Sequence, residues 1–278
     1  MKKLNYKKLI KQNTCKGSEH EDVIKAIKKA IGSKADVVLG GSLAKGTALQ
    51  NYDIDLFVRF YNEVEVDLLE KALKKQFKNV ERVHGSRDYF SMDYKGVNYE
   101  IIPVLKIDSP SKAENITDVS YFHIEWVKNN LQNPEQVKIA KLFAKANGVY
   151  GAESYINGFS GYILELLVAH YGSFENLVEE ASKWRPKVIV DVAKHYKSRE
   201  EVLKKMNESK LQSPLIVVDP VDKNRNASAA LSEEIFSKFV LVCRDFVDKP
   251  SLKCFDKKDF SIAEIKRRAY FHRHPRHR

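Results

Sequence analysis

Apolar residues in the first third of the chain follow two different spacings. Some segments carry them three and four positions apart, as amphipathic helices do, and others carry them in short runs or at alternate positions, as strands do. Lys95-Gly96 joins two alternating runs and indicates a hairpin turn. Pro103 has no N–H group, so we expect its strand to lie at a sheet edge or to end there. The expected helices are 19–31 and 64–77, and the expected strands are 36–39, 54–58, 89–93 and 97–104.

From about residue 117 the pattern becomes that of long helices. Ser109-Pro110-Ser111 interrupts the chain just before, and Leu215–Val218 is an isolated apolar run. Ser232 is placed to cap the last long helix. We therefore expect an α/β head with a small mixed sheet at 1–113, a mostly helical neck at 114–255 and a short basic tail at 256–278. The expected helices of the neck are 118–130, 134–147, 159–171 and 228–247.

Composition narrows the class of protein. With 278 residues, of which 43% are hydrophobic and 31% charged, the chain can bury a core of its own. No apolar stretch approaches the roughly 18 residues that cross a membrane. The three cysteines lie far apart and form no C-x-x-C pair, which disfavours a disulfide framework or a structural zinc site. We expect a globular protein of the reducing cytoplasm.

The positive charge lies at the two ends of the chain. Lys and Arg number 48 against 37 Asp and Glu, a net charge of +11. Six lysines fall within residues 1–18 and six further cations within 266–278, with no acid in either segment. Without these twelve, 36 cations face 37 acids. Two solvated tails explain this pattern, and so does a polyanionic partner, because clustered cations bind phosphates.

The most specific pattern for chemistry lies between residues 40 and 55. Gly40-Gly41-Ser42 ends a strand and begins a helix, so backbone N–H groups at the helix start can face an anion. Asp53-Ile54-Asp55 follows, and its two acids share one face of the next strand. The simple alternative is a glycine turn followed by solvated acids. The joint pattern G-S-x-x-x-G-T and then D-x-D instead favours a site for a phosphate and a divalent cation.

Paired carboxylates beside a phosphate-binding turn suit Mg²⁺, which takes oxygen ligands. Two such ions about 3.5–4 Å apart would activate an attacking hydroxyl and stabilise a leaving pyrophosphate. A third carboxylate is needed to hold both ions. Glu100, in the alternating run 97–104, is the candidate.

Five segments, spread over roughly residues 20–255, resemble the same family of proteins. They are Gly41–Asp55, Tyr121–Trp126, Lys145–Glu153, Gly158–Tyr162 and Val217–Ala227. In collinear order they resemble the archaeal (class I) CCA-adding enzymes, tRNA nucleotidyltransferases of the polymerase-β-type superfamily. The resemblance implies a nucleotidyltransferase head and a helical neck. It also implies addition of C, C and A to the tRNA 3′ end from CTP and ATP, with Mg²⁺ and without a nucleic-acid template.

In the first part of the chain, the resemblance implies roles for five residues. Asp53, Asp55 and Glu100 would be the catalytic metal ligands, and Ser42 and Lys45 would face the triphosphate of the nucleotide. The family usually has Asp where Glu100 stands. The extra methylene moves the carboxylate by about a bond length, and such sites are sensitive to displacements of about 1 Å.

Four more nucleotide-binding positions are implied further along the chain. His123, Lys141 and Tyr150 match positions that hold the triphosphate, and Arg225 matches the arginine that selects the base. Taken without the resemblance, the first three are ordinary residues of helix faces and loops.

The resemblance also implies partners. The acceptor stem and 3′ end of tRNA would be the substrate, without a membrane. In the family a large body and tail follow the segment that ends at Ala227, whereas here 51 residues follow. We expect either a minimal enzyme, with the basic end as an RNA-contacting arm, or a homodimer or separate chain that supplies the tail. Two other functions stay open: an oligo- or poly-adenylating transferase on the same catalytic fold, and a catalytically weak RNA-binding subunit.

Overall fold

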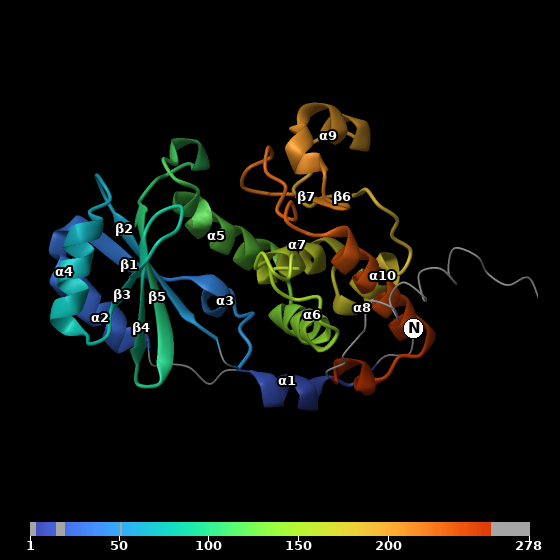
Figure 1. Cartoon of the computed structure of the whole chain (residues 1–278), viewed down its shortest axis with the longest axis horizontal. Helices are drawn as coiled ribbons and strands as arrows, with labels where there is room; N and C mark the ends of the chain where they lie inside the picture. Colours follow the sequence, from blue (N-terminus) through green and yellow to red (C-terminus); the bar gives the residue numbers. More distant parts are fainter. Residues whose placement is uncertain (1–3, 15–19, 51, 257–278) are drawn as a thin grey trace, which may run out of the picture. The chain divides into compact units, whose positions relative to one another are not determined.

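The computed structural model describes residues 4–14, 20–50 and 52–256 (Figure 1). These residues divide into two compact units. The head consists of residues 12–129, and the helical unit consists of residues 130–256 together with 4–11. Within the described residues, every helix is too short or too polar to cross a membrane.

The head is built on the small mixed sheet that the sequence predicts. Its strands are β1 (Ala35–Leu39), β2 (Ile54–Phe60), β3 (Glu81–Val83), β4 (Tyr89–Tyr94) and β5 (Val97–Leu105). They lie in the order β1-β2-β5-β4-β3. β2 and β5 run parallel, and every other neighbouring pair is antiparallel. The expected α/β head with a mixed sheet is therefore confirmed.

Helices cover the two faces of this sheet differently (Figure 1). Those of the head are α2 (His20–Ile31), α3 (Gly41–Ala44), α4 (Val66–Gln76), α5 (Ser120–Asn130) and the 3-10 turns η1 (Gly32–Lys34), η2 (Pro110–Lys112) and η3 (Ile116–Val119). The apolar faces of α2 and α4 pack in one core with alternate residues of β2, such as Ile54 and Leu56, which are at most 1% exposed. The residues between them, Asp55 among them, point to the opposite face.

The β4–β5 hairpin forms as the sequence predicts. Lys95 and Gly96 both have positive φ angles, 56° and 76°, as a tight two-residue turn requires. Pro103 departs from the expectation, because β5 is a central strand and continues to Leu105. The proline is tolerated because β4 pairs with β5 only as far as Ile101, so no β4 carbonyl lies opposite residue 103.

The head extends beyond the expected boundary at residue 113. Asp118 of η3 is 2% exposed and accepts hydrogen bonds from the backbone N–H of Leu105, at 2.8 Å, and from the Arg87 guanidinium. Ile124 of α5 packs on the face of the sheet that carries Phe57. A buried ion pair and an apolar contact thus attach residues 114–129 to the sheet.

The helical unit is held together by aromatic packing. Its helices are α1 (Lys7–Asn13), α6 (Pro134–Ala146), α7 (Gly161–Tyr171), α8 (Phe174–Ala181), α9 (Arg199–Lys205) and α10 (Glu233–Asp248), with the 3-10 turns η4 (Glu208–Leu211) and η5 (Leu252–Phe255). Ring contacts join Phe143, Phe174, Phe246 and Phe255. Tyr6, before α1, contacts Phe174 and Phe255. Tyr6 therefore belongs to this unit.

A small β-α-β element projects from the helical unit (Figure 1). β6 (Val188–Asp191) and β7 (Leu215–Val218) pair in parallel, and α9 lies in the crossover between them. Val202 of α9 packs with β7 in a core of its own. Leu215–Val218, an isolated apolar run in the sequence, is therefore half of a two-stranded sheet. Of the expected tail at 256–278, residues 257–278 lie outside the described residues.

Candidate active site

The glycine loop of the sequence motif packs directly against Asp55. Gly40 donates its backbone N–H to the Asp55 carbonyl at 2.7 Å. Gly41 has a φ of +57°, and a Cβ atom at this position would lie 1.6 Å from Asp55 Oδ2. Thr47 closes the loop by donating its N–H to the Ser42 carbonyl at 2.9 Å. Glycine at 41 is thus required both by the backbone conformation and by the close approach of the carboxylate.

The three predicted carboxylates lie on one face of the parallel pair of strands. Asp55 on β2 is the direct partner of Glu100 on β5. Asp53 precedes Asp55 by two positions and therefore faces the same side. Asn98, two positions before Glu100, donates its amide Nδ2 to Asp53 Oδ1 at 3.0 Å. The fold brings Asp53, Asp55 and Glu100 together, and Asn98 fixes the first of them.

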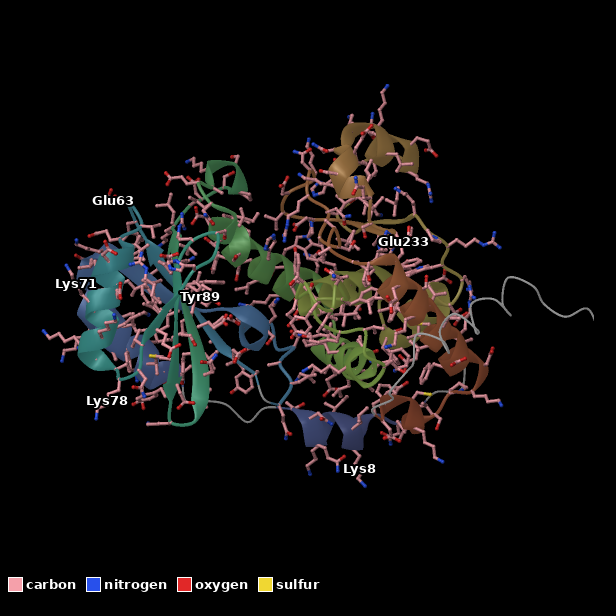
Figure 2. All side chains as sticks on the ribbon, in the orientation of Figure 1. Lys8, Glu63, Lys71, Lys78, Tyr89 and Glu233 are labelled. Atoms are coloured by element: carbon pink, nitrogen blue, oxygen red, sulfur yellow. The ribbon has the colours of Figure 1, made fainter. Side chains whose placement is uncertain are left out.

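Burial and repulsion between these carboxylates raise the pKa of two of them, Asp55 and Glu100. Burial, the Glu100 charge and the Asp53 charge raise the pKa of Asp55 to about 7, against the effect of nearby Lys45. Burial and the Asp53 charge also raise the pKa of Glu100. Tyr89, labelled in Figure 2 at the start of β4, lies near both Glu100 and Asp53, and burial and these charges raise its pKa. Clustered negative charge of this kind favours a bound cation.

Removing the Asp55 charge should stabilise the metal-free protein at neutral pH. The pKa of Asp55 is higher in the folded than in the unfolded chain, so the protonated group favours folding and this contribution is lost as pH rises from about 4 to about 7. Asp55→Asn should match wild type near pH 4 and exceed it by a few kcal/mol at pH 8. Urea unfolding in EDTA at both pH values measures this difference. An equal stability difference at both pH values would contradict it.

The donor set fits a hard divalent cation, but the side chains are not closed around a site. Within the described part of the chain, no three acid, histidine or cysteine side chains form a complete metal centre. Carboxylates that repel one another and converge on one strand face are ligands that Mg²⁺ or Mn²⁺ prefers.

The other predicted residues of the head lie on nearby elements. Ser42 lies in the first turn of α3, directly after the Gly41 contact with Asp55. Lys45 follows α3 and lies near enough to lower the pKa of Asp55. His123 is on α5, with its Nε2 buried.

In the helical unit, the structure brings Lys141 and Tyr150 together at the start of α7. A Cβ atom at Gly161 would lie 3.1 Å from the Tyr150 hydroxyl and 3.3 Å from Lys141 Nζ. Lys141 is 3% exposed and pairs with the fully buried Glu165 at 3.4 Å. Burial and the charges of Glu165 and Glu153 raise the pKa of Tyr150 to about 12. This cluster offers one ammonium and one hydroxyl.

Arg225 is held by a buried carboxylate. Its Nη1 pairs with Asp219 Oδ2 at 2.6 Å; the arginine side chain is 34% exposed, and that of Asp219 is fully buried. The other oxygen of Asp219 accepts hydrogen bonds from the Tyr162 hydroxyl at 3.3 Å and from the backbone N–H of Val221 at 2.8 Å. Asp219 thus fixes the guanidinium while leaving part of it accessible.

Sequence reasoning missed the residues that support these groups. Asn98, Glu165 and Asp219 each contact a predicted site residue, but none belongs to a local motif that reveals this. The clearest available signal was Asp219, because a lone acid directly after a fully apolar strand is rarely left unpaired.

Two family models match the two parts of the chain. One, described as a nucleotidyltransferase domain, matches residues 20–119. The other, described as the second domain of tRNA nucleotidyltransferase, matches residues 135–256. The CCA-adding enzyme of Nanoarchaeum equitans is 44% identical over 230 residues, which are 81% of this chain. The chain is a homologue of the archaeal CCA-adding enzymes.

The homology has a limited span. The CCA-adding enzyme of Methanosarcina acetivorans is 35% identical over 79% of this chain. The chain covers 58% of the Nanoarchaeum enzyme and 48% of the Methanosarcina enzyme. It therefore spans about half the length of the relatives it matches.

Two solved structures of nucleotide-adding enzymes share the fold. A cytoplasmic RNA terminal U-transferase superposes with a TM-score of 0.69 at 13% identity, covering 91% of this chain and 97% of its own. The Cid1 poly(U) polymerase, solved with Mg and 3′-dATP, gives 0.69 at 14% identity, covering 91% and 100%. At these identities the likeness establishes the fold.

Proposed function

We propose that this chain is an enzyme that adds C, C and A to the 3′ end of tRNA from CTP and ATP, without a nucleic-acid template, and releases pyrophosphate. Its substrates would be the tRNA acceptor stem with its 3′ end and the two nucleotides, and it would act in the cytoplasm. Homology to CCA-adding enzymes supports the substrates. The catalytic head, the helical neck and the basic tail would each contribute to binding or catalysis.

One observation carries the proposal of nucleotidyl transfer. Asp55 and Glu100 are direct partners in parallel strands, Asp53 shares their face, and Gly41 packs against Asp55. This adjacency supports one site in which the glycine turn would bind phosphate and the carboxylates would bind a cation. Mg²⁺ held by Asp53, Asp55 and Glu100 would supply Lewis-acid stabilisation of the charge that develops on the phosphate. Ser42 and Lys45 would orient the triphosphate from α3.

The helical unit also offers groups that suit a nucleotide. Lys141 and Tyr150 present an ammonium and a hydroxyl, both of which suit triphosphate oxygens, as does His123 from α5. Arg225 presents a planar donor fork that suits the edge of a base. Their rigid support by Glu165 and Asp219 favours binding sites over solvated charges.

The deciding experiment incubates the purified chain with tRNA lacking its terminal CCA, Mg²⁺ and labelled CTP or ATP. The expected product is three nucleotides longer, with two CMP added before one AMP. Product length on a sequencing gel and the dependence on each nucleotide read this out. A long tail made from ATP alone would instead identify an adenylating transferase. RNA binding without any transfer would identify a subunit that needs another chain.

Asp219 should matter for nucleotide choice because it positions Arg225. Asp219→Asn removes the charge that holds Nη1, and hydrogen bonds to charged groups contribute about 1.5–3 kcal/mol. We expect the ratio of correct to incorrect nucleotide in kcat/KM to fall roughly tenfold, as about 1.4 kcal/mol corresponds to tenfold. Asp222→Asn is the matched control, since Asp222 caps Asn224 at a more exposed position. An unchanged ratio with lowered stability would leave Asp219 a purely structural role.

A further inference from the structure

Two loops meet at the carboxyl ends of β6 and β7, next to Arg225. The loop after β6 spans residues 192–198, and the loop after β7 spans 219–225. Tyr196 joins them by donating its hydroxyl to the Lys223 carbonyl at 2.8 Å. His195 Nε2 lies 3.0 Å from the Pro220 carbonyl. We refer to the surface formed by these two loops and Arg199 as the β6–β7 loop surface.

The acids of this surface are used inside the fold. Asp219 is fully buried against Arg225 and Tyr162. Asp191, at the end of β6, accepts the backbone N–H of Tyr196 at 2.8 Å. Asp222 accepts the backbone N–H of Asn224 at 2.9 Å. These carboxylates hold the loops in shape, since Asp219 pairs with the Arg225 guanidinium and Asp191 and Asp222 accept backbone N–H groups.

The cations of the same surface are turned outward. Lys194, Lys197, Arg199 and Lys223 are all exposed, and within the described residues none of them forms an ion pair. Three of them serve the loops only through backbone groups, because Lys194 N–H binds the Asp191 carbonyl, Lys197 N–H binds Glu201 and the Lys223 carbonyl binds Tyr196. Their ammonium groups remain available.

Elsewhere on the chain, exposed lysines often have acidic partners. Lys205, on the same helix as Arg199, pairs with Glu201, and Lys74 on α4 pairs with Glu70. The β6–β7 loop surface thus combines rigid loops, inward acids and outward cations. A formal charge count conceals this, since residues 219–225 contain two acids and two cations.

We propose that the β6–β7 loop surface binds the phosphate backbone of the RNA substrate next to Arg225. Cations held on a rigid frame gain affinity for a phosphate chain by releasing its counterions. Arg225 ends the second loop of this surface, and its side chain is 34% exposed, so RNA bound here would lie beside it. The inference rests on the proposed function, which identifies the partner as RNA. The contact that it assigns lies outside the carboxylate site and outside the two basic ends of the chain.

The test compares two triple variants of the full chain. One carries Lys194→Gln, Lys197→Gln and Lys223→Gln, which remove charge and keep side-chain length. The control carries Lys71→Gln, Lys75→Gln and Lys78→Gln, exposed lysines on or after α4 that form no ion pair within the described residues. Figure 2 labels Lys71 and Lys78 on the head. Both variants lose three charges, so general electrostatics affects them alike.

Affinity for an acceptor-stem hairpin RNA is measured by fluorescence anisotropy at several salt concentrations, without nucleotide. We expect the loop variant to bind about tenfold or more weakly near 0.1 M salt, with a slope of log affinity against log salt smaller by about two units. The control should bind within about threefold of wild type. Thermal unfolding confirms that both variants are folded.

Equal losses in the two variants, or no loss in the loop variant, would overturn the proposal. The same measurement separates it from the proposed function. A wild-type chain that binds the hairpin and loses this binding in the loop variant supports the surface even if no nucleotide is added. A wild-type chain that does not bind the hairpin overturns the surface.

Discussion

Asp53→Ala and Asp55→Ala should each abolish nucleotide transfer while leaving the chain folded. Each change removes a carboxylate from the face that carries Glu100, so the proposed divalent-cation site would lose a ligand. The Lewis acid contributes several kcal/mol to the transition state, which corresponds to a loss of about three orders of magnitude or more. Single-turnover incorporation of CMP into tRNA lacking its CCA end measures this loss.

Stability separates this effect from misfolding. Because clustered carboxylates repel one another, the Asp55→Ala variant should be at least as stable as wild type at pH 8 without metal. Asp93→Ala is a control on the same sheet, since Asp93 accepts the backbone N–H of Gly96 in the hairpin turn. Substantial CMP incorporation by the Asp53 or Asp55 variant would remove these residues from the metal site.

Glu100→Gln should cost two or more orders of magnitude in rate, whereas Glu100→Asp should retain activity or improve it. Glu100 lies opposite Asp55 in the parallel register, so its charge faces the same ligand position. Gln keeps the shape and removes the charge, and a lost charged ligand costs about 3 kcal/mol or more. Asp restores the residue usual in the family and shortens the side chain by one methylene. The two variants therefore separate charge from reach.

The measurement is the Mg²⁺ dependence of CMP incorporation for both variants. The Gln variant should need more metal as well as turning over more slowly, because the ligand acts through the ion. Wild-type turnover by the Gln variant would place the third ligand elsewhere. Asp93, the next acid along the sheet, is a poor substitute, since it is exposed and engaged in the hairpin turn.

The grouping of the turn and the acids in the head was predictable because its signals are local. Glycines, a helix start and two acids within 16 positions specify the turn and the shared strand face without any tertiary contact. The position of Glu100 in a strand could be predicted, because the β4–β5 hairpin has a clear turn signal. The alternation of apolar and polar residues then assigns residue 100 to one face of that strand. The support of Asp53 by Asn98 was not, since it joins positions 45 apart.

The helical unit shows where local patterns fail. β6 has four residues, and its partner β7 lies more than 20 positions away, so neither strand nor pairing can be read from periodicity. α8 was not predicted, because a helix of eight residues gives only a short periodic pattern. Ser232, by contrast, was predicted as a cap, and it accepts the N–H of Ile235 because capping depends on neighbouring residues.

The grouping of residues 4–11 with the helical unit makes the head an insertion. Residues 4–11 belong to the helical unit, residues 12–129 form the head as one continuous segment, and the residues from 130 onward belong to the helical unit again. A gene fragment for the head can therefore be exchanged between relatives as one cassette. The helical unit cannot be exchanged as one cassette, because it is made of two separate stretches of chain. Tyr6 and the helices from α6 onward pack together and must be inherited together. In recombination between homologues, two crossovers that flank the head should give folded proteins more often than a single crossover.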